Sequence, residues 1–491
     1  MSDITLKMKD HSFIKILECE PHIVSELSEH FTFDVEGAKY MPAVKARRWD
    51  GKIRMLNRTN GEINVGLYPE INRFALKNGY KIKIEEGVFG TPFEPNKIEH
   101  VKTLGWVGTL GLPFAPRDYQ YDAFCHAITN KRCVLLSPTG SGKSFIIYLL
   151  MRWYLQNHKE KILLIVPTTS LVEQMNKDFE EYGFDVNSEV HKIYSGKDKD
   201  TDKRVVVTTW QSIYKLGPKW FEPYGCIFGD EVHGFKSKSL SSIMNKSIYA
   251  EYRFGTTGTL DGTQVNKMVL EGLFGPVKRV TTTAKLQERK QLAQLDIDIL
   301  QLQYSKELRD QLTNATYQEE IDFIVSHDPR NRFIRNLACS LTGNTLVLFN
   351  LVDKHGKVLR DLIEEKLDKD RRLFYVSGET KTTDREAVRK IVEKQSDAVV
   401  LASLGTFSTG INIRNLHNIV FASPSKSQIR VLQSIGRGLR VSEDGRGTRL
   451  YDIADDLRSG GKPNFTLRHS AERIRIYEEE HFPFKITVVE L

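Results

Sequence analysis

The sequence predicts an α/β protein with two successive parallel sheets, preceded by a small α+β module. Apolar runs of strand length alternate with segments of helical periodicity from about residue 117 onward, which indicates parallel strands joined by helical crossovers. Polar motifs directly follow several of these runs. The stretch 134–150 (VLLSPTGSGKSFIIYLL) shows the repeating unit clearly, because a strand, a glycine-containing loop and a helix follow in that order.

Length and composition limit the class of protein. The 491 residues are too many for one hydrophobic core and predict about three domains. A formal net charge of +8 permits an acidic polymer as partner without requiring one. Five scattered cysteines with no CxxC pair argue against a zinc site or a disulfide framework and fit a reducing cytoplasm. With no signal-peptide core and no run of about 18 apolar residues, we expect a soluble cytoplasmic protein without a membrane partner.

Residues 1–90 are expected to form a small nucleic-acid-binding α+β module. Within it, residues 40–57 read as two strands around the Asp50-Gly51 turn. Basic side chains beside a tryptophan suit phosphate contacts combined with stacking on a base or sugar. The alternative is a solvated hairpin with the tryptophan packed beneath it. The cluster consists of Lys45, Arg47, Arg48, Trp49, Lys52, Arg54 and Arg58.

A Gly- and Pro-rich stretch over residues 91–116 predicts a linker or packing arm between this module and the first sheet domain, which we expect over 117–325. The sequence RDYQ opens that domain. The Gln120 side chain can bind adenine through N6 and N7, whether in DNA or in ATP. An ordinary helix start on the surface is the alternative for so short a motif.

The stretch SPTGSGKS predicts a phosphate-binding loop in which Ser137 replaces the usual first glycine. Gly140 and Gly142 let backbone N–H groups converge on phosphates, Lys143 reaches the β- and γ-phosphates, and the Ser144 hydroxyl can bind Mg²⁺. An ordinary strand-to-helix turn is the alternative. The candidate ATP ligands of this loop are Thr139, Gly140, Ser141, Gly142, Lys143 and Ser144.

Two acidic residues follow the apolar run CIF in the stretch GDEVH. Asp230 can hold Mg²⁺ directly or through water, and Glu231 can polarise the attacking water. Adjacent acids are common on surfaces but less common directly after a buried strand. In parallel sheets ligands bind at the carboxyl ends of the strands, where these motifs fall.

The second sheet domain is expected over 326–491, with five candidate strands and no phosphate loop of its own. One ATP per pair of domains is therefore expected, bound at their interface. Gln433, Arg437 and Arg440 fall on one predicted helix at spacings that place them on one face. From Gly460 onward we expect a helix and a terminal strand that pack on this domain.

In these motifs the sequence resembles the superfamily-two helicases over about residues 115–480, and the whole chain is similar to the UvsW helicases of T-even phages. The motifs occur in the family's order. They are RDYQ (117–120), SPTGSGKS (137–144), VPTTSLVEQ (166–174), VVTTWQS (206–212), DEVH (230–233), TGTL (257–260), LVLFN (346–350), LGTFSTGINI (404–413) and QSIGRGLR (433–440). The DEVH box differs from the DEAD form of the specialised RNA helicases.

The resemblance implies two RecA-like motor domains in tandem, with ATP and Mg²⁺ as cofactors. It implies that Arg117 and Gln120 recognise adenine, that Glu231 positions the catalytic water, and that Arg437 and Arg440 with Gln433 act on the transition state. Other implied roles concern coupling and strand contact. The coupling residues are His233, Thr257, Gly258 and Thr259, and the residues on the strand backbone are Thr168, Thr169, Thr208, Thr209, Ser408, Thr409 and Gly410.

The resemblance further implies a monomeric, ATP-dependent helicase or translocase of phage DNA replication, recombination and repair, acting in the host cytoplasm. The implied substrates are branched DNA, single-stranded DNA and RNA–DNA hybrids, and the implied protein partners are single-strand-binding and recombination proteins. Three alternatives stay open on the residues alone. They are an RNA-directed helicase, the motor subunit of a restriction complex, and a nucleic-acid-binding protein that uses ATP only as a switch.

Overall fold

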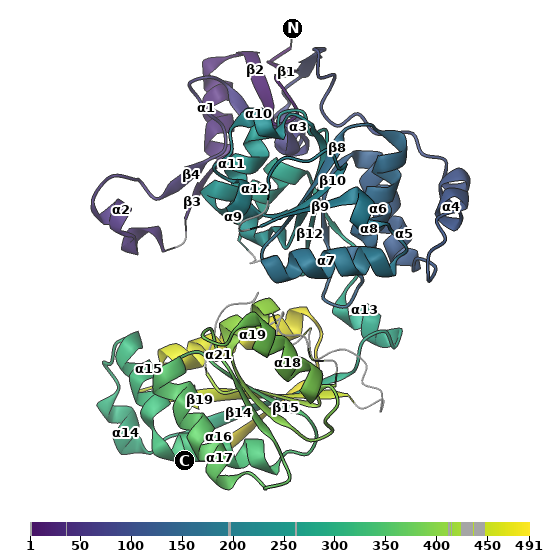
Figure 1. Cartoon of the computed structure of the whole chain (residues 1–491). Helices are drawn as coiled ribbons and strands as arrows, with labels where there is room; N and C mark the ends of the chain where they lie inside the picture. The colour runs from purple at the N-terminus through teal and green to yellow at the C-terminus, as the bar shows by residue number, and fades with distance from the viewer. Residues whose placement is uncertain are drawn as a thin grey trace. The chain divides into compact units, whose positions relative to one another are not determined.

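The computed structural model describes residues 2–35, 37–194, 198–260, 263–410, 413, 415–423, 436 and 447–491 (Figure 1). The chain divides into two compact units. The first comprises Met1–Ser137 and Gly142–Val280, and the second comprises Pro138–Ser141 and Thr281–Leu491. Each unit contains one seven-stranded parallel sheet, so the predicted fold class is confirmed.

The N-terminal module is a four-stranded mixed sheet with two helices, as expected for an α+β module. The strand order is β5-β2-β1-β6, with β1 and β6 parallel and the other pairs antiparallel. The apolar residues of the sheet and helices form one core. The elements are β1 (Ile4–Met8), β2 (Phe13–Cys19), α1 (Pro21–His30), β5 (Glu62–Asn64), α3 (Tyr68–Asn78) and β6 (Ile82–Glu85).

The expected hairpin over residues 40–57 is wrong. Its first half contains the short helix α2 (Pro42–Lys45), and β4 (Lys52–Arg54) pairs instead with β3 (Thr32–Asp34). Pro42 occupies the first position of α2, where its fixed φ and missing N–H suit a helix start. We call residues 32–35 and 37–54 the arm, since β3, β4 and α2 extend away from the sheet of the module (Figure 1).

The module is packed on the first sheet domain through polar contacts. Buried Arg253 donates to the Ser12 hydroxyl at 2.7 Å, and Asn64 donates to the Asn245 side chain at 3.0 Å. A side chain at Gly66 would place its Cβ 1.9 Å from the Glu271 carbonyl oxygen, so the two surfaces meet at backbone distance. The module and the first sheet domain therefore form one unit.

The first seven-stranded sheet has the order β13-β7-β12-β11-β8-β10-β9, and all its pairs are parallel. Alternate residues of each strand enter different cores, because successive side chains point to opposite faces. Leu135 and Leu164 pack with one group of helices, whereas Val134 and Leu163 pack with the other. The strands are β7 (Arg132–Leu136), β8 (Lys161–Val166), β9 (Val190–Ile193), β10 (Val205–Thr209), β11 (Tyr224–Asp230), β12 (Tyr252–Thr257) and β13 (Val277–Arg279).

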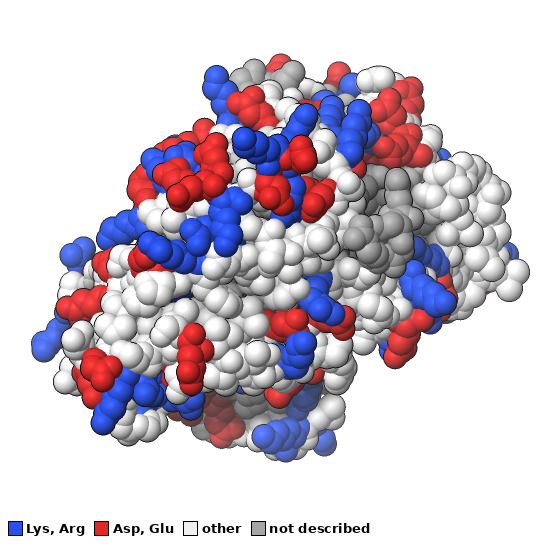
Figure 2. Space-filling view, turned by 90° about the horizontal axis from the view of Figure 1, so that it is seen from below, with Lys and Arg blue, Asp and Glu red and all other residues white. Residues whose placement is uncertain are grey.

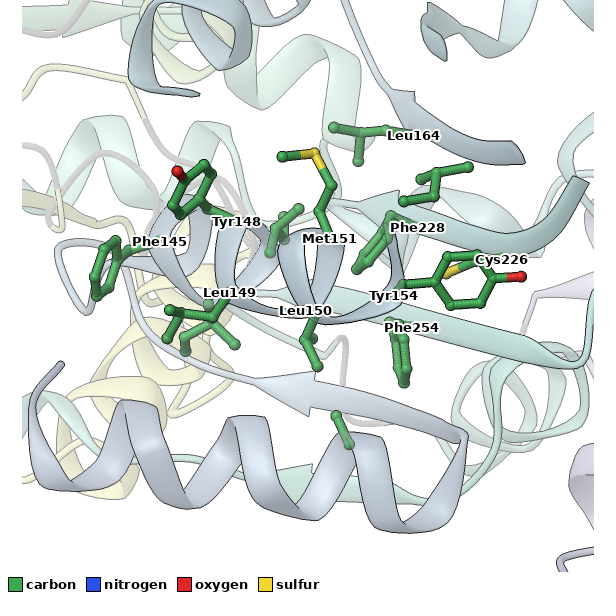
Figure 3. Close-up of a cluster of buried hydrophobic side chains, with 14 of the residues drawn as sticks. Phe145, Tyr148, Leu149, Leu150, Met151, Tyr154, Leu164, Cys226, Phe228 and Phe254 are labelled. Atoms are coloured by element: carbon green, nitrogen blue, oxygen red, sulfur yellow. The ribbon is translucent and has the colours of Figure 1, made fainter. Parts of the chain in front are cut away.

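Helices cover both faces of this sheet. α6 (Lys143–Asn157), which follows the phosphate loop, is buried at every position from Phe145 to Met151 (Figure 3). This burial explains why its sequence is a nearly continuous apolar run and not an amphipathic pattern. On the same face lie α5 (Asp118–Asn130) and α7 (Thr169–Glu181), and on the other face lie α11 (Lys238–Lys246) and α12 (Gln264–Phe274).

The second sheet has the order β16-β17-β15-β18-β19-β14-β20 and is also parallel. The expected strands of this half are confirmed, as are the terminal helix and strand that pack on the domain. The five stretches expected as strands are 344–350, 371–378, 397–405, 418–424 and 449–455. The elements are β15 (Thr345–Phe349), β16 (Leu373–Val376), α18 (Thr382–Val392), β17 (Val399–Ser403), β18 (Asn418–Phe421), β19 (Thr448–Asp456), α21 (Phe465–Glu479) and β20 (Phe484–Glu490).

The division between the units differs from the expected domain boundary at 325/326. β14 (Leu295–Gln303) pairs along its whole length with β19 and also with β20, so it belongs to the second sheet. The units divide after Val280. The stretch 91–116, expected as a linker or packing arm, contains α4 (His100–Gly108), whose Trp106 ring stacks on Phe124 of α5.

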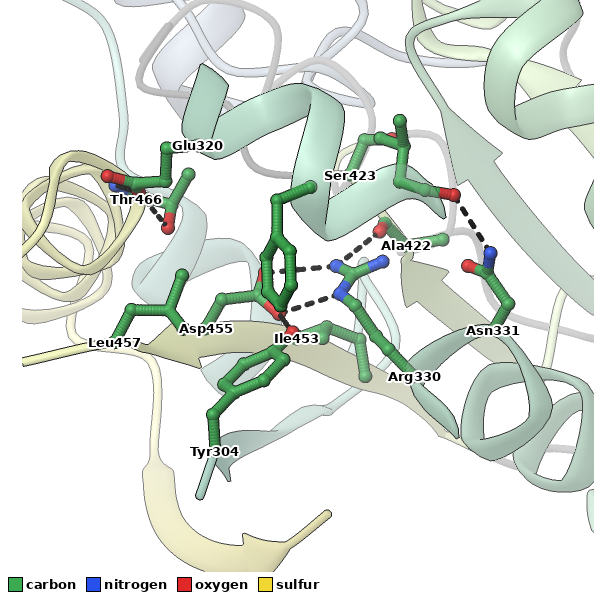
Figure 4. A network of polar contacts seen from close by, with 12 residues as sticks. Tyr304, Glu320, Arg330, Asn331, Ala422, Ser423, Ile453, Asp455, Leu457 and Thr466 are labelled. Carbon is green, nitrogen blue, oxygen red and sulfur yellow. Dashed lines mark hydrogen bonds and ion pairs between the residues drawn. The ribbon is translucent and has the colours of Figure 1, made fainter. Parts of the chain in front are cut away.

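A buried ionic network joins the ends of three strands of the second sheet to α16 (Asp328–Ser340) (Figure 4). Arg330 Nε donates to Asp455 Oδ1 at 2.6 Å, and Arg330 Nη2 donates to the Ala422 carbonyl oxygen at 2.9 Å. The Tyr304 hydroxyl donates to the same Asp455 oxygen at 2.8 Å. Removing Arg330 or Asp455 would leave the other charge buried and uncompensated, so this network holds α16 against the strand ends.

Candidate active site

The phosphate loop has the predicted order of strand, loop and helix. β7 ends at Leu136, the Ser137 N–H donates to the Thr257 carbonyl oxygen of β12 at 2.9 Å, and α6 begins at Lys143. Gly140 and Gly142 both have φ of +82°, a backbone conformation that favours glycine. Ser137 adopts no such conformation, which explains why serine is tolerated where the common motif has glycine.

Gln120 lies beside this loop. It is 4% exposed, and its Oε1 accepts a hydrogen bond from the Arg117 N–H at 2.9 Å, which caps α5. A Cβ on Gly142 would stand 2.4 Å from Gln120 Nε2, so the amide and the loop are in direct contact. Gln120 does start a helix, but it is buried against the phosphate loop and not on an open surface.

The two acids of the DEVH stretch lie at the carboxyl end of β11. Asp230 Oδ1 accepts from the Thr256 hydroxyl of the neighbouring strand at 2.7 Å. Glu231 follows with φ of 50° in the left-handed region, a strained conformation for a residue with a side chain. Lys143 Nζ lies 3.7 Å from Glu231 Oε1 and donates to the Ser137 carbonyl oxygen at 3.4 Å. The fold thus brings the predicted lysine and acids together.

The environments of the two carboxyls drive their pKa values apart. Burial and the neighbouring Glu231 carboxylate raise the pKa of Asp230 to about 6. Burial also acts to raise the pKa of Glu231. Lys143, His233 and the Gly258 N–H act against it, and the pKa lies at about 2. Glu231 is therefore the more acidic member of the pair, and Lys143 is the cation that compensates it.

The predicted coupling residues form a connected set behind Glu231. His233 Nδ1 lies 3.1 Å from the Thr257 hydroxyl, which in turn donates to the Thr259 carbonyl oxygen at 2.9 Å. The Gly258 backbone N–H donates to the Glu231 carboxylate. β11 and β12 are parallel neighbours, so their carboxyl ends bring residues far apart in the sequence into contact.

The predicted strand-contacting residues differ in their access to solvent. Thr168 caps α7 and Thr169 is exposed at its first position. Thr208 is buried and donates its hydroxyl to the Ile193 carbonyl oxygen at 3.0 Å, and Thr209 is 4% exposed with its hydroxyl 2.9 Å from that of Ser212. The hydroxyls of Thr208 and Thr209 are thus bonded within the protein, and their role in strand contact stays a prediction.

The predicted site residues of the second domain lie largely outside the described part. Ser408, Thr409 and Gly410 end the helix α19 (Leu404–Gly410), and their side chains are not among those described. Gln433, Arg437 and Arg440 lie outside the described residues. Their roles remain predictions from the sequence.

The basic residues of the arm are on its surface. Lys45, Arg47, Arg48, Lys52 and Arg54 are exposed, whereas Trp49 is half-buried and its indole N–H donates to the Lys52 carbonyl oxygen at 2.9 Å. Arg54 pairs with Asp50. Figure 2 shows acidic and basic side chains interspersed over one face of the protein, so the modest net charge does not itself locate a nucleic-acid surface.

One contact of the site escaped the sequence analysis. The Tyr182 hydroxyl lies 3.1 Å from that of Ser144, although Tyr182 follows a helix that carries no recognised motif at this end. Phe114 is also near, with its ring centroid 4.7 Å from that of Phe145 and 50% of its surface exposed. Contacts between side chains so far apart in the sequence leave no pattern in the local periodicity.

Three family profiles match the chain. The profile "Type III restriction enzyme, res subunit" matches residues 113–262, "DNA helicase UvsW, N-terminal" matches 3–85, and "Helicase conserved C-terminal domain" matches 329–442. No helix of the described residues is long and apolar enough to cross a membrane.

Several known proteins are similar to the chain. The ATP-dependent DNA helicase uvsW of Enterobacteria phage T4 is 36% identical over 513 residues, which cover 100% of both chains. The crystal structure of T4 UvsW superposes with a TM-score of 0.52 at 33% identity, covering 99% of both chains. The DNA 3'-5' translocase XPB2 of Sulfurisphaera tokodaii is 23% identical, over 77% of this chain and 87% of its own.

A likeness in fold extends to more distant enzymes. The type ISP restriction-modification enzyme LlaBIII has a TM-score of 0.56 at 17% identity, covering 77% of this chain and 32% of that one. The full-length identity and the match of the N-terminal module, together with the phosphate loop and acids assembled at the sheet edge, lead to one assignment. The chain belongs to the UvsW family of ATP-dependent DNA helicases.

Proposed function

We propose that this helicase remodels branched DNA, through fork regression, junction branch migration and unwinding of RNA–DNA hybrids. The observation that carries the proposal is the exposed basic arm on a module packed against the ATP-binding domain. A nucleic-acid contact made by the arm would be held at a fixed distance from that domain, as a motor at a branch point requires. We expect a monomer that acts in the cytoplasm of an infected cell, on single-stranded DNA and alongside single-strand-binding and recombination proteins.

The nucleotide chemistry follows from the residues at the sheet edge. Lys143 would bind the β- and γ-phosphates, and Gln120 with Arg117 would bind adenine beside the loop. When Lys143 moves from Glu231 to the phosphates, the Glu231 carboxylate loses the Lys143 positive charge and its pKa rises. Glu231 then becomes a better hydrogen-bond acceptor for the attacking water. We also propose that Gln433, Arg437 and Arg440 complete the site.

The donor set fits Mg²⁺. The Ser144 hydroxyl and the Asp230 carboxylate are the oxygen ligands that Mg²⁺ prefers, and the raised pKa of Asp230 marks a buried acid that a cation would compensate. No group of three or more His, Cys, Asp or Glu in the described part of the chain could hold a metal by itself. This agrees with an ion held jointly by two side chains and the nucleotide phosphates, whose charge it would neutralise.

The arm can be tested by replacing Arg47 and Arg48 together with alanine. We expect the affinity for a four-way DNA junction to fall by about 10-fold and the slope of log K against log salt to become shallower by about 2. Both guanidinium groups are exposed, so the fold should be unaffected. Fluorescence anisotropy over a salt series measures both quantities. Replacing exposed Lys159 with alanine is the matched control, and an unchanged slope for the arm variant would contradict this assignment.

The substrate is tested by ATP-dependent processing of a synthetic four-way junction beside a plain duplex and an RNA–DNA hybrid. The intact protein should branch-migrate the junction, and Lys143→Ala and Glu231→Gln should not. If ATP were hydrolysed while every one of these substrates stayed intact, the protein would be a translocase or a nucleotide-driven switch. The assignment to branched DNA would then be wrong. Hydrolysis stimulated by RNA and not by DNA would favour an RNA-directed enzyme instead.

A further inference from the structure

Tyr182 connects α7, which starts at the expected strand-contacting residues Thr168 and Thr169, to Ser144, the proposed Mg²⁺ ligand. It is the C-cap residue of α7, and its hydroxyl lies 3.1 Å from that of Ser144, the second residue of α6. Both residues belong to the first unit. None of the helicase motifs includes Tyr182, so its contact with Ser144 is additional to the machinery described above.

The position of Tyr182 is fixed from several sides. The Tyr148 hydroxyl of α6 donates to the Tyr182 carbonyl oxygen at 3.1 Å. The Tyr182 ring stands edge-on to Phe145, with centroids 5.1 Å apart, and edge-on to Phe114 at 5.8 Å. These contacts hold the Tyr182 ring in place without using its hydroxyl. The hydroxyl is therefore left to bond with Ser144.

The structure of α7 suits it to transmit a displacement from one end of the helix to the other. Its first turn is capped by Thr168, whose hydroxyl accepts from the Leu171 N–H at 3.4 Å, and Thr169 is exposed there. Val172, Met175 and Phe179 are buried along one side and pack in the core of the domain. The helix has 13 residues, which corresponds to a length of about 20 Å. A displacement of its C-terminal end would thus move its N-terminal end as well.

We propose that Tyr182 is a positioning residue that couples the nucleotide site to the DNA-contacting residues Thr168 and Thr169 through α7. Either hydroxyl of the Ser144–Tyr182 pair can donate in the structure. A serine that binds a cation through its oxygen keeps its proton as a single donor, and Tyr182 Oη is an acceptor within reach. Nucleotide with Mg²⁺ therefore selects one direction of this hydrogen bond and strengthens it. This inference rests on the proposed function.

The test uses Tyr182→Phe, which removes the hydroxyl and retains the packed ring. Affinity for labelled single-stranded DNA is measured by fluorescence anisotropy, without nucleotide and with ATPγS and Mg²⁺. We expect the change that nucleotide causes in wild-type affinity to shrink by about 5-fold in the variant, with the nucleotide-free affinity unchanged. Tyr194→Phe is the matched control, since the Tyr194 hydroxyl donates to Glu173 of α7 at 2.7 Å. Tyr194 follows the edge strand β9, which four other strands separate from β7 and the phosphate loop.

The possible failures are distinguishable. A wild-type protein whose DNA affinity does not respond to ATPγS would refute the motor mechanism itself. A response that is equally large in wild type and Tyr182→Phe, or equally reduced in Tyr194→Phe, would refute the coupling role alone. Hydrogen exchange supplies a measurement that needs no variant. The backbone amides of Ser170 and Leu171 should exchange more slowly in wild type with ATPγS and Mg²⁺, and unchanged exchange there would also overturn the proposal.

Discussion

Replacing Lys143 with alanine should reduce ATP hydrolysis by about 10²- to 10³-fold, the effect typical of removing one preorganised electrostatic contact to a transition state. The Lys143 ammonium lies 3.7 Å from Glu231 Oε1, and it acts to lower the pKa of both Asp230 and Glu231. The variant therefore loses the phosphate contact and leaves two adjacent acids without this cation. We expect weaker nucleotide binding as well. Steady-state ATPase assays and titration with a fluorescent ATP analogue measure the two effects.

Lys159→Ala provides the control for charge, because this exposed lysine follows α6 at the end remote from the loop. It should hydrolyse ATP at the wild-type rate. Lys143→Arg keeps the charge but not the geometry of the ammonium, and we expect it to remain impaired. A Lys143→Ala protein that retained more than about a tenth of the wild-type rate would exclude the phosphate-binding role, given the size of effect expected for such a contact.

Replacing Glu231 with glutamine should reduce hydrolysis by about 10²- to 10⁴-fold, the range expected for loss of a general base. Glutamine has nearly the same shape as glutamate and can still accept from the Gly258 N–H that now bonds the carboxylate. Nucleotide binding should therefore persist, and ATP should accumulate on the protein without turnover. A single-turnover assay with radiolabelled ATP separates the binding step from the chemical step.

The matched control is Glu222→Gln, an exposed glutamate just before β11, whereas Glu231 directly follows that strand. It should not change the rate. If Glu231→Gln lost nucleotide binding together with hydrolysis, Glu231 would have to be a residue that stabilises the loop. Hydrolysis near the wild-type rate would mean that another group orients the water.

The sequence predicted most of the sheet strands because the strands of parallel sheets are buried on both faces and read as continuous apolar runs. The phosphate loop was predictable for a similar reason, since Gly140 and Gly142 are needed where φ is +82°. The prediction of a hairpin in the arm was wrong because the segment is short and its apolar and polar residues do not clearly alternate. With Pro42 it fits a helix start as well as a strand. The helix carrying Arg437 and Arg440 stays a prediction from the sequence.

Local sequence thus determined which segments form strands, which loop binds phosphate and which acids end a strand. Only the tertiary structure decided the contacts between distant segments. It assigned β14 to the second sheet by pairing it with β19, turned the hydroxyls of Thr208 and Thr209 inward, and placed Tyr182 against Ser144. The physical reason is that periodicity and turn chemistry act over a few residues, whereas strand order and side-chain partners depend on how complete elements pack.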